Sequence, residues 1–527
     1  MVDQSHSAFD LEDRLRRLNE IGVALSVERN LTVLLERILL EARSFTRADA
    51  GTLFLLKSDH LTFEIAQNDT LKSFVGGRHG KMDVPPVPLN RESVSGYVAV
   101  TGEVLNIEDV YTDPVYHFEG PKNYDRMTGY RTRSILGVPM KDHEDQIIGV
   151  VQLINALHPL TGEVVPFSAQ DQSLIQSLAS QAAVAINNVR LIEETERLFD
   201  SFVQVMATAI DERSPYTGGH IRRVAEMAMA VAHSINACKD GPLAERQFSE
   251  DELNELRIAS WMHDIGKITT PEWVVDKPTK LHTLFDRIEL VRTRFALIAK
   301  TIELERLQRQ AAGQPLPAGL GEEYDRRLQA LAGDLAFLER ANTPGEFMQD
   351  ADLERLRQIA GQTYQDGGAE HPYLSEDELR NLCIRKGSLT GEERQKINDH
   401  ASMSIKMLAQ IPFTRKLDQV PQIAGAHHEK LDGSGYPLGL KAEQISLQAR
   451  ILALVDIFES LSADDRPYRA KPMPREVVLR ILREEVESNH IDRELYDLFV
   501  REQLYLKLDE IKARMARAAA GSDAPEV

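Results

Sequence analysis

The sequence predicts a multidomain α+β protein, in which an antiparallel sheet with helices is followed by an all-α bundle that carries a helical insertion. Its 527 residues are too many for one ordinary core and suggest about three domains. Apolar residues alternate in short runs between residues 52 and 155, as they do in strands, whereas elsewhere they recur at the spacing of helices. Two further helical stripes lie within residues 282–387, and these stripes predict the insertion.

Composition narrows the class of protein. The 82 acidic and 62 basic residues give a formal charge of -20, which disfavours nucleic acid and anionic bilayers as partners. The two cysteines, Cys238 and Cys383, lie far apart and predict neither a disulfide framework nor a thiolate metal site. The start of the chain lacks the pattern of a signal peptide, and no apolar run approaches the roughly 18 residues of a membrane span. We therefore expect a soluble, cytoplasmic protein with no nucleic-acid partner.

Residues 1–29 are predicted to form an N-terminal helix, because Leu11, Leu18 and Leu25 recur at helical spacing. Asn30 is a suitable N-cap for a second helix, since the side chain of asparagine accepts a hydrogen bond from the first helical turn.

Short strands follow these helices. Residues 52–56 and 61–65 flank a charged turn, which predicts a hairpin. Residues 134–140 and 147–155 form a second pair around the charged turn at residues 141–145. A helix, about six strands and a closing helix describe an α+β domain whose sheet is mostly antiparallel.

This order of elements resembles a GAF domain over residues 30–190. The resemblance is carried by three stretches, residues 94–98, 106–110 and 149–155. It implies a sensory domain.

The GAF resemblance also bears on the ligand. Cyclic-nucleotide-binding members of the family carry an Asn-Lys, Phe, Asp-Glu signature after the last strand. The matching positions here are Asn155-Ala156, Phe167 and Asp171-Gln172. Since the lysine and the glutamate are absent, the ion pair of that signature cannot form. The resemblance therefore implies a sensor for an unknown small ligand, with an unliganded dimerisation and relay module as the alternative.

Residues 173–210 are predicted to form one linker helix with a coiled-coil repeat. One core position is occupied by Ile175, Ala182, Val189, Val203 and Ile210, and the other by Leu178, Ala185, Ile192, Phe199 and Met206. This run without Gly or Pro favours a parallel homodimer whose two halves communicate through the helix. Glu196 interrupts the first series, as a solvated face or as a hinge. The alternative is an ordinary amphipathic helix that packs on its own domain.

The second half of the chain is organised around His263-Asp264-Ile265-Gly266-Lys267. In helical geometry His263 and Lys267 lie one turn apart on the same side, so a metal-binding imidazole and a phosphate-binding ammonium share one cleft. Asp264 lies beside them and is able to bridge two cations. The pentapeptide therefore predicts a metal site next to a phosphate site.

Two further histidines lie on predicted helices. A helix begins near Gly219, which places His220 in its first turn. A second helix spans residues 391–408 and contains His400. Either histidine alone is more often a surface or capping residue than a ligand.

Two more segments supply the same kinds of side chain. His427 and His428 precede a glycine-rich turn, a pattern that core packing does not select. Asp456 lies in the apolar helix over residues 450–458, where a carboxylate is costly unless a cation neutralises it. Together the five segments offer the mixed nitrogen and oxygen donors that suit iron, manganese or zinc.

Residues 211–280 and 387–474 resemble the HD-GYP family of metal-dependent phosphohydrolases, whose usual substrate is cyclic di-GMP. The family name is legible in His263-Asp264 and in Gly435-Tyr436-Pro437. Carried across by position, the metal ligands of the family are His220, His263, Asp264, His400, His427, His428 and Asp456. Members with three metals carry a glutamate where this chain has Tyr216. The resemblance thus implies two divalent cations, iron or manganese.

The resemblance also implies a role for each residue. One cation would be held by His220, His263 and Asp456, and the other by His400, His427 and His428, with Asp264 as the bridge. Phosphate would be contacted by Lys267 and Arg466, and the nucleotide by the turn of Gly435 and Tyr436. Asp264 and Lys267 are then the catalytic residues.

On this resemblance the chain is a two-metal phosphodiesterase that hydrolyses cyclic di-GMP to pGpG, with or without further hydrolysis to GMP, under control of its sensory domain. One alternative keeps the chemistry and changes the substrate to another cyclic dinucleotide or a nucleotide phosphate. A second alternative is a signalling protein that binds nucleotide without turnover, and a third is a purely structural dimer.

The catalytic domain is expected over residues 211–480, with an insertion at residues 282–387 that the family lacks. One helical stripe comprises Phe285, Ile288, Val291, Phe295, Ile298 and Ile302, and a second comprises Leu328, Leu331, Leu335 and Leu338. These stripes predict an antiparallel helical hairpin, which would serve as a lid, a partner platform or a dimer contact. Residues 361–371 are predicted to be a polar loop. Residues 481–527 are predicted to hold C-terminal helices and a disordered tail from Ala518.

Overall fold

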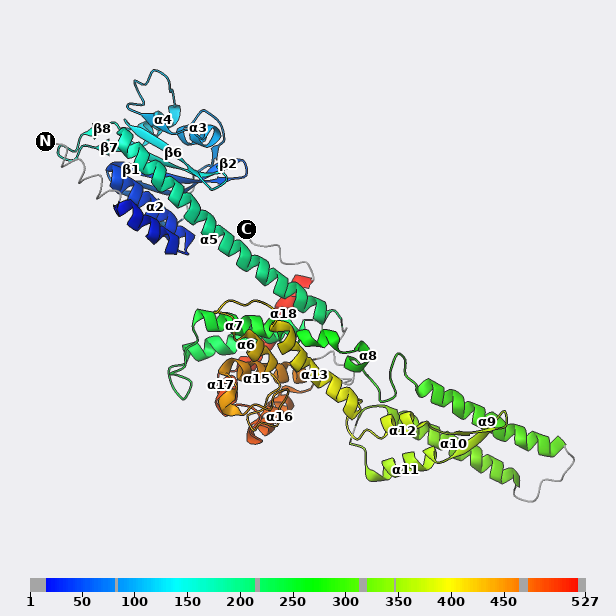
Figure 1. Ribbon diagram of the computed structural model, residues 1–527. Helices are drawn as coiled ribbons and strands as arrows, with labels where there is room; N and C mark the ends of the chain where they lie inside the picture. The colour runs from blue at the N-terminus through cyan, green and yellow to red at the C-terminus, as the bar shows by residue number, and fades with distance from the viewer. Residues whose placement is uncertain are drawn as a thin grey trace. The chain divides into compact units, whose positions relative to one another are not determined.

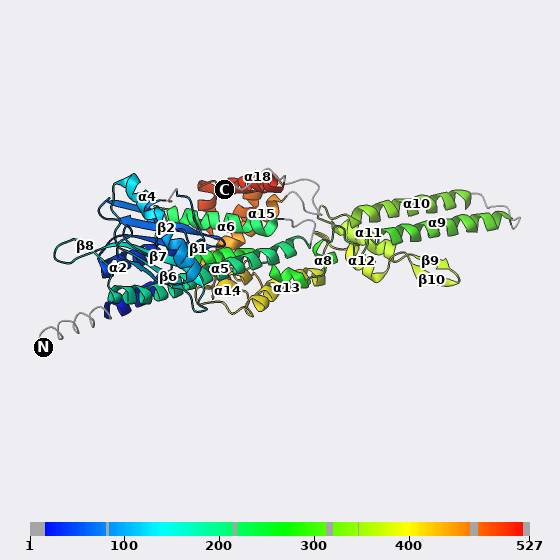
Figure 2. The same ribbon diagram turned by 90° about the horizontal axis from the view of Figure 1, so that it is seen from above.

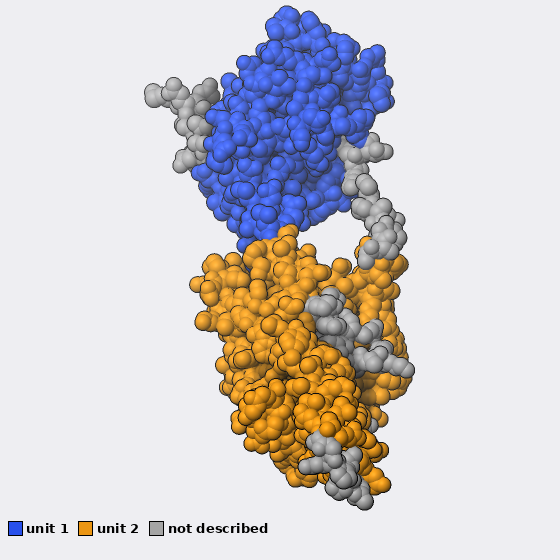
Figure 3. All heavy atoms as spheres, turned by 90° about the vertical axis from the view of Figure 1, so that its right-hand side faces the viewer, with its two compact units in different colours: residues 1–199 blue, residues 200–527 orange. Residues whose placement is uncertain are grey.

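The computed structural model describes residues 16–80, 84–213, 219–311, 320–345, 347–463 and 473–519. The chain forms two compact units, residues 1–199 and residues 200–527 (Figures 1 and 3). Unit 1 contains an antiparallel sheet with helices, and unit 2 is mostly helical, so the predicted fold class is confirmed. Over the described ranges, no helix is both long enough and apolar enough to cross a membrane.

The strands of unit 1 form one antiparallel sheet. They are β1 (Ala48–Lys57), β2 (His60–Asn68), β3 (Ser73–Gly76), β4 (Val87–Pro88), β5 (Leu105–Ile107), β6 (Ile135–Lys141), β7 (Ile147–Leu157) and β8 (Val164–Val165). Their order is β3-β2-β1-β7-β6-β5, with β4 paired to β2 and β8 paired to β7. The two predicted hairpins are confirmed as β1 with β2 and β6 with β7.

The sheet of unit 1 is covered by helices. After the helical residues 16–27 come α2 (Leu31–Thr46), the short η1 (Gly77–His79), α3 (Val94–Thr101), α4 (Glu119–Thr128) and the start of α5 (Ala169–Asp211). The Asn30 side chain accepts a hydrogen bond from the Val33 amide at 3.1 Å, as an N-cap should. Alternation along β1 sends Leu53 and Leu55 into the core shared with α2 and α5, and Phe54 into a second core with α3.

Helix α5 is continuous over 43 residues, as predicted. The first half of the predicted heptad, however, packs into the core of unit 1. The core of unit 1 contains Ile175, Leu178, Ala182, Ala185 and Val189. That half therefore follows the alternative of an amphipathic helix that packs on its own domain.

A different face of α5 is apolar and exposed. It carries Val184, Leu191, Leu198 and Val205, with exposures of 48%, 55%, 72% and 65%. These residues also recur at heptad spacing, and Phe202 is 53% exposed beside them.

Unit 2 contains a helical bundle. Its elements are α6 (His220–Ala237), α7 (Glu250–Met262), η2 (Ile265–Thr269), α8 (Glu272–Val275), α13 (Gly391–Leu408), α14 (Val420–Gly425), η3 (Ala442–Gln444), α15 (Leu447–Ser462), α16 (Arg475–Glu487), α17 (Arg493–Arg501), η4 (Leu504–Leu506) and α18 (Lys507–Ala519). The residues Val478, Leu482, Leu495, Leu498 and Phe499 are buried, whereas Ile481 is only partly buried. Residues 520–527, most of the predicted tail, lie outside the described residues.

The insertion has a hydrophobic core of its own. It comprises α9 (Ile288–Ala311), α10 (Leu320–Asn342), α11 (Asp350–Ala360), β9 (Thr363–Asp366), β10 (Ala369–Pro372) and α12 (Glu376–Leu382). Helices α9 and α10 lie side by side as the predicted hairpin (Figures 1 and 2).

Two details of the predicted insertion are wrong. Phe285 is 50% exposed and precedes α9, so it is not part of the buried stripe. The stretch 361–371 is not a polar loop, because β9 and β10 pair as a hairpin. Gly367 and Gly368 have φ of 59° and 85°, which lets the chain reverse in a tight turn. All but one of the hairpin residues are exposed, so alternation of burial gave no signal.

Candidate metal centre

Five segments of unit 2 converge on one buried centre. His220 is the first residue of α6, and His263 follows the last residue of α7. His400 lies inside α13, and Asp456 inside α15. His427 and His428 follow the end of α14.

The segment from His263 to Lys267 is not the single α-helix that the sequence analysis assumed. Helix α7 ends at Met262, Asp264 leaves helical geometry, and the 3-10 helix η2 follows. The reason lies at Gly266, where a Cβ atom would collide with the carbonyl oxygen of His400. The chain approaches α13 so closely there that only glycine fits.

Ser404 on α13 fixes this close approach. Its hydroxyl donates to the His263 carbonyl at 2.7 Å and accepts from the Gly266 amide at 3.0 Å. Lys267 consequently turns back, and its Nζ lies 2.5 Å from Asp264 Oδ2. The predicted proximity of Lys267 to the centre therefore arises from a turn.

The donor atoms fall into two groups. One consists of His220, His263 and Asp264, and the other of His400, His427 and His428, with the atoms of each group within 4.8 Å of one another. Asp264 faces both groups, because its Oδ2 lies 3.4 Å from His263 Nε2 and its Oδ1 lies 3.3 Å from His400 Nε2. This arrangement is what a bridging carboxylate requires.

Asp456 lies beside the first group. Its Oδ1 lies 3.3 Å from His220 Nε2 and 3.8 Å from His263 Nε2. With Asp456, the first group thus combines two imidazoles with two carboxylates, whereas the second group contains imidazoles alone.

Burial keeps most of these imidazoles neutral. It lowers the pKa of His263, lowers that of His427 further, and brings the pKa of His428 to about 4. A neutral imidazole is the form that binds a metal ion. The Nδ1 of His263 donates to the Ser260 carbonyl at 2.8 Å and that of His427 to the Ala424 carbonyl at 2.5 Å, so Nε2 carries the lone pair of both rings.

The carboxylates of the centre stay ionised although they are buried. Burial alone would raise the pKa of Asp264, but the charge of Lys267 and hydrogen bonds from His220 and His400 hold it well below the usual value. A carboxylate in that state is ready to bind cations.

The donor set fits two divalent cations. His263 Nε2 is buried and has no hydrogen-bond partner among the residues that the structure describes, and such an atom is costly unless something binds it. One group of nitrogen and oxygen donors and one group of nitrogen donors, on either side of one carboxylate, suit iron, manganese or zinc.

The glycine-rich turn lies against the second group. The Tyr436 ring packs on the His428 ring with centroids 4.8 Å apart, and its amide donates to the His428 carbonyl at 3.2 Å. At Gly435 a Cβ atom would collide with backbone atoms of Glu429 and Lys430. Glu429 holds the turn by accepting from the Leu438 and Leu440 amides at 2.6 and 2.8 Å.

A small cavity opens beside the first group. Its lining includes Asp211, His220, Asp264 and Lys267, and 26% of the Lys267 side chain is exposed. Arg466 and Tyr216 fall outside the described residues.

The residues that support the candidate ligands were not predicted from the sequence. Glu459 on α15 is fully buried, and its Oε2 lies 2.5 Å from His220 Nδ1. Burial opposes its ionisation, but His220 and Arg223 lower the pKa of Glu459 to about 2. The available signal was a second acidic residue one turn after Asp456 in an apolar helix.

A second cavity lies in unit 1. It measures about 590 Å³, and its lining includes Thr52, Gln67, Ser95, Tyr124 and Thr132. None of the described residues that line it is charged.

Asn155, the residue that matches the GAF nucleotide signature, is buried and has φ of 57°. Its Nδ2 donates to Tyr130 Oη at 3.0 Å and to the Arg131 carbonyl at 2.8 Å. Its Oδ1 accepts from the Arg133 amide at 2.7 Å. These bonds tie the end of β7 to the segment before β6.

Comparison with protein families agrees with both units. A GAF domain model matches residues 30–186, and two HD domain models match residues 217–336 and 320–495. These matches agree with the predicted order of a GAF domain followed by an HD-type domain.

Individual relatives are similar over parts of their length. The 3'3'-cGAMP-specific phosphodiesterase 1 of Vibrio cholerae serotype O1 is 38% identical over 250 residues, which are 43% of this chain and 55% of that protein. The 3'3'-cGAMP-specific phosphodiesterase 3 of the same organism is 41% identical over 108 residues, which are 20% of this chain and 22% of that protein. The match thus spans about half the length of the first relative.

Among solved structures, a GAF domain of an Acinetobacter phosphoenolpyruvate-protein phosphotransferase is 17% identical. The alignment covers 34% of this chain and 97% of that one, with a TM-score of 0.26.

Proposed function

We propose that the chain is a two-metal phosphodiesterase that hydrolyses a cyclic dinucleotide, cyclic di-GMP, to pGpG. One observation carries this proposal: Asp264 presents one oxygen to each of two histidine groups, with Lys267 beside it at an exposed cavity. A buried carboxylate between two such groups is the arrangement that two-metal phosphoester hydrolysis uses.

The side chains of the site have different proposed roles. Two divalent cations, held by His220, His263 and Asp456 and by the histidine trio with Asp264 shared, would polarise the phosphodiester and activate water. Lys267 offsets the negative charge that develops on the phosphoryl oxygens. The turn of Gly435 and Tyr436 offers backbone and an aromatic face to the nucleotide.

A second substrate is favoured by the relatives. Two of them carry the name 3'3'-cGAMP-specific phosphodiesterase. Since cyclic di-GMP and 3'3'-cGAMP share the ribose phosphate ring and differ in one base, the same metal chemistry serves both.

The test combines metal analysis with hydrolysis. Protein purified without oxygen is expected to contain about two equivalents of iron or manganese. It should convert cyclic di-GMP to pGpG, and a parallel assay with 3'3'-cGAMP measures base preference through the two values of kcat/KM.

Asp264→Asn is the decisive variant. It should lower kcat on the order of 10³-fold or more, because the bridging charge is lost while the shape is kept. Metal-loaded wild-type protein that turns over no cyclic dinucleotide would refute the proposal. Nucleotide binding without turnover would favour the alternative of a binding protein.

The end of α5 supports control of this site by the GAF domain. Arg213 Nη1 donates to the Lys267 carbonyl and Nη2 to the Thr270 carbonyl, both at 2.6 Å. Asp211 Oδ2 accepts from the Ile221 amide, next to His220, at 3.3 Å. A shift of α5 would therefore move both the Lys267 segment and the first turn of α6.

The sensory ligand is inferred to be small and uncharged, because the cavity of unit 1 offers hydroxyl and amide groups but no charge among its described lining residues. Such a ligand should raise the melting temperature of wild-type protein and change its turnover. Arg213→Ala should bind the ligand equally well and respond less in turnover. A ligand that changes turnover equally in both proteins would remove Arg213 from the relay.

Dimerisation is proposed through the exposed face of α5. Val184, Leu191, Leu198 and Val205 offer a heptad seam that is exposed on this helix. Sedimentation should show a dimer for the wild type and a weaker one for Leu198→Glu. A monomeric wild type at micromolar concentration would refute it.

The reaction is assigned to the cytoplasm. Cys238 and Cys383 are both free thiols, which fits a reducing compartment. Fractionation of cells that express the tagged chain tests this assignment.

A further inference from the structure

His220 is oriented differently from the other buried histidines of the metal centre. Three of them, His263, His400 and His427, donate Nδ1–H to the carbonyl oxygen of the residue three positions earlier in the chain. His220 Nδ1 instead meets the carboxylate of Glu459 at 2.5 Å. His220 is thus the ring of this set that is backed by a negative charge.

Glu459 of α15 is held by two residues of α6, His220 and Arg223. It lies one turn after Asp456 on α15, and Arg223 lies one turn after His220 on α6. Arg223 Nε donates to Glu459 Oε1 at 2.6 Å, while Oε2 faces His220. On each helix a candidate ligand is followed one turn later by a supporting residue. The candidate ligands are His220 and Asp456, and the supporting residues Arg223 and Glu459 pair with each other.

The Glu459 carboxylate has two physical effects on His220. It accepts a hydrogen bond from Nδ1–H, so the ring is fixed with Nε2 toward Asp264 at 3.6 Å and Asp456 at 3.3 Å. It also makes the ring a stronger electron donor, as carboxylates behind metal-binding histidines do. The Glu459 side chain is fully buried, so solvent screens this interaction little.

The two halves of the centre differ accordingly. The half with His220 and His263 contains the carboxylates of Asp264 and Asp456 and has Glu459 behind it. The half with His400, His427 and His428 has no carboxylate behind its rings among the described residues, and two of the rings are supported by backbone carbonyls. A cation in the first half meets more negative charge.

We propose that Glu459 is a positioning residue that orients His220 and makes the His220 half the tighter of two cation sites. The inference rests on the proposed function in one respect, which is that cations occupy this centre. It assigns a role to a side chain that contacts neither substrate nor metal.

The experiment measures metal retention in the full chain. Wild type, Glu459→Gln, Glu459→Asp and the control Glu255→Gln are loaded with Mn²⁺ and titrated with a chelator, and bound metal is counted. Glu255 is a suitable control because it is a buried carboxylate of α7 that accepts from the Gln419 amide at 3.0 Å, outside the centre. Paramagnetic resonance of the same samples distinguishes a coupled Mn²⁺ pair from a single ion.

Glu459→Gln should weaken one of the two equivalents about 10–100-fold, which is the usual effect of losing such a support. The coupled-pair signal should give way to that of a single ion. Glu459→Asp, which keeps the charge on a shorter arm, should lie between Glu459→Gln and wild type. Glu255→Gln should match the wild type.

The outcomes are separable. Wild-type protein without stoichiometric metal refutes the proposed function. Wild type with two equivalents and a folded Glu459→Gln with the same two affinities overturns the inference about Glu459. If circular dichroism shows that Glu459→Gln is unfolded, Glu459→Asp decides, since unchanged affinity at both sites in that variant overturns the inference as well.

Discussion

Two lysines of unit 2, Lys267 and Lys277, each pair with a carboxylate but differ in what else they reach. Lys267 Nζ lies 2.5 Å from Asp264 Oδ2, and 26% of its side chain is exposed at the cavity beside the metal centre. Lys277 Nζ lies 2.8 Å from Glu393 Oε1, and 1% of its side chain is exposed. A lysine–carboxylate pair thus lies beside a cavity in the first case and inside the protein in the second.

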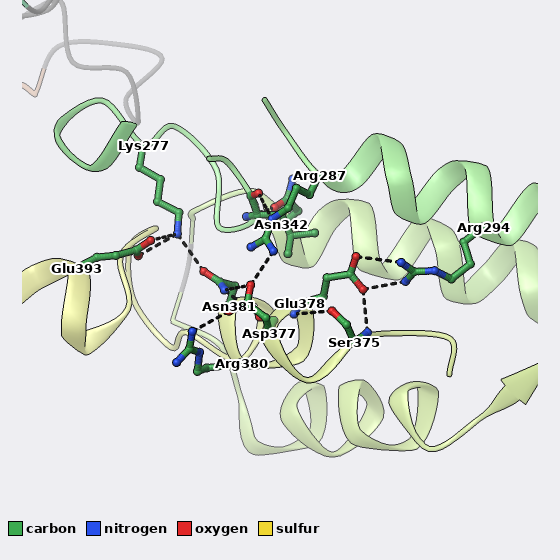
Figure 4. A network of polar contacts seen from close by, with 11 residues as sticks. Lys277, Arg287, Arg294, Asn342, Ser375, Asp377, Glu378, Arg380, Asn381 and Glu393 are labelled. Carbon is green, nitrogen blue, oxygen red and sulfur yellow. Dashed lines mark hydrogen bonds and ion pairs between the residues drawn. The ribbon is translucent and has the colours of Figure 1, made fainter. Parts of the chain in front are cut away.

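The surroundings of Lys277 show what the buried version does. Its ammonium donates to both oxygens of Glu393 and to Asn381 Oδ1 at 2.8, 2.9 and 2.9 Å (Figure 4). Three donors are all that a lysine has, so none remains for a substrate. Glu393 belongs to α13, the helix of His400, and Asn381 belongs to α12 of the insertion.

The exposure of the lysine side chain therefore decides the role of a lysine–carboxylate pair. The buried pair joins the root of the insertion to the helix that carries His400. The other pair leaves the partly exposed Lys267 at a cavity, where the proposed function places a phosphate. Three substitutions can break or sharpen this contrast.

Lys277→Met has the largest expected effect, and the effect is on stability. Removing one partner leaves the buried Glu393 carboxylate unpaired, which costs about 3–5 kcal/mol. The unfolding transition of unit 2 should move to lower temperature, as measured by calorimetry. Turnover well below that transition should change little.

The control for Lys277→Met adds Glu393→Gln. The amide carries no charge, and its oxygen can still accept from the Thr390 amide, which Glu393 Oε2 now binds at 2.8 Å. The double variant should recover most of the lost stability, because no unpaired charge remains. Equal destabilisation of the single and double variants would mean that packing, and not charge, is the cause.

Lys267→Met is expected to affect turnover instead. Loss of a cation that stabilises developing phosphoryl charge lowers kcat about 10²-fold. The metal content and the unfolding transition should stay near those of the wild type. Lys300→Met is the control, because Lys300 is 76% exposed on α9 and pairs with Glu303, and it should leave kcat unchanged. A Lys267 variant with normal kcat and lower stability would erase the contrast with Lys277.

Much of this site follows from the sequence because its ligands lie on strongly patterned helices. The helix around His400 was predicted with the bounds 391–408 that the structure has. Asp456 was singled out as a carboxylate in an apolar helix, and it is buried there. Residue type and helical period suffice for such positions.

Other features depend on contacts that one segment cannot reveal. The turn between His263 and Lys267 exists because Gly266 passes the His400 carbonyl, a neighbour far away in the chain. The seam of α5 was misassigned because residues such as Ile175 and Leu178 satisfy a heptad and also fill the core of unit 1. Sequence periodicity does not distinguish these two partners.

The smallest expected effect concerns a third lysine, Lys280, which lies at the root of the insertion as Lys277 does. It is 4% exposed, and its Nζ donates to the Leu382 carbonyl at 3.3 Å. In the part of the chain that the structure describes, no carboxylate lies within ion-pair distance of it. Burial lowers its pKa from 10.5 to about 8.

The sign of the pH effect follows from these two values. Between pH 8 and 10.5 the folded protein has released the Lys280 proton, whereas the unfolded chain still holds it. Unfolding therefore takes up a proton, and stability rises with pH by at most about 1.4 kcal/mol per unit. Below pH 8 both states are protonated, so the cost of burying the charge is fully present there.

Lys280→Met removes this titration. Relative to the wild type, the variant should be more stable at pH 7, and its advantage should shrink by about 1 kcal/mol between pH 8 and pH 9. Calorimetry of both proteins across that range measures the difference, in which the titration of all other groups cancels. A constant difference would show that Lys280 keeps its proton in the fold. Lys280 would then resemble Lys277, and burial without an ion pair would not suffice to neutralise a lysine at this root.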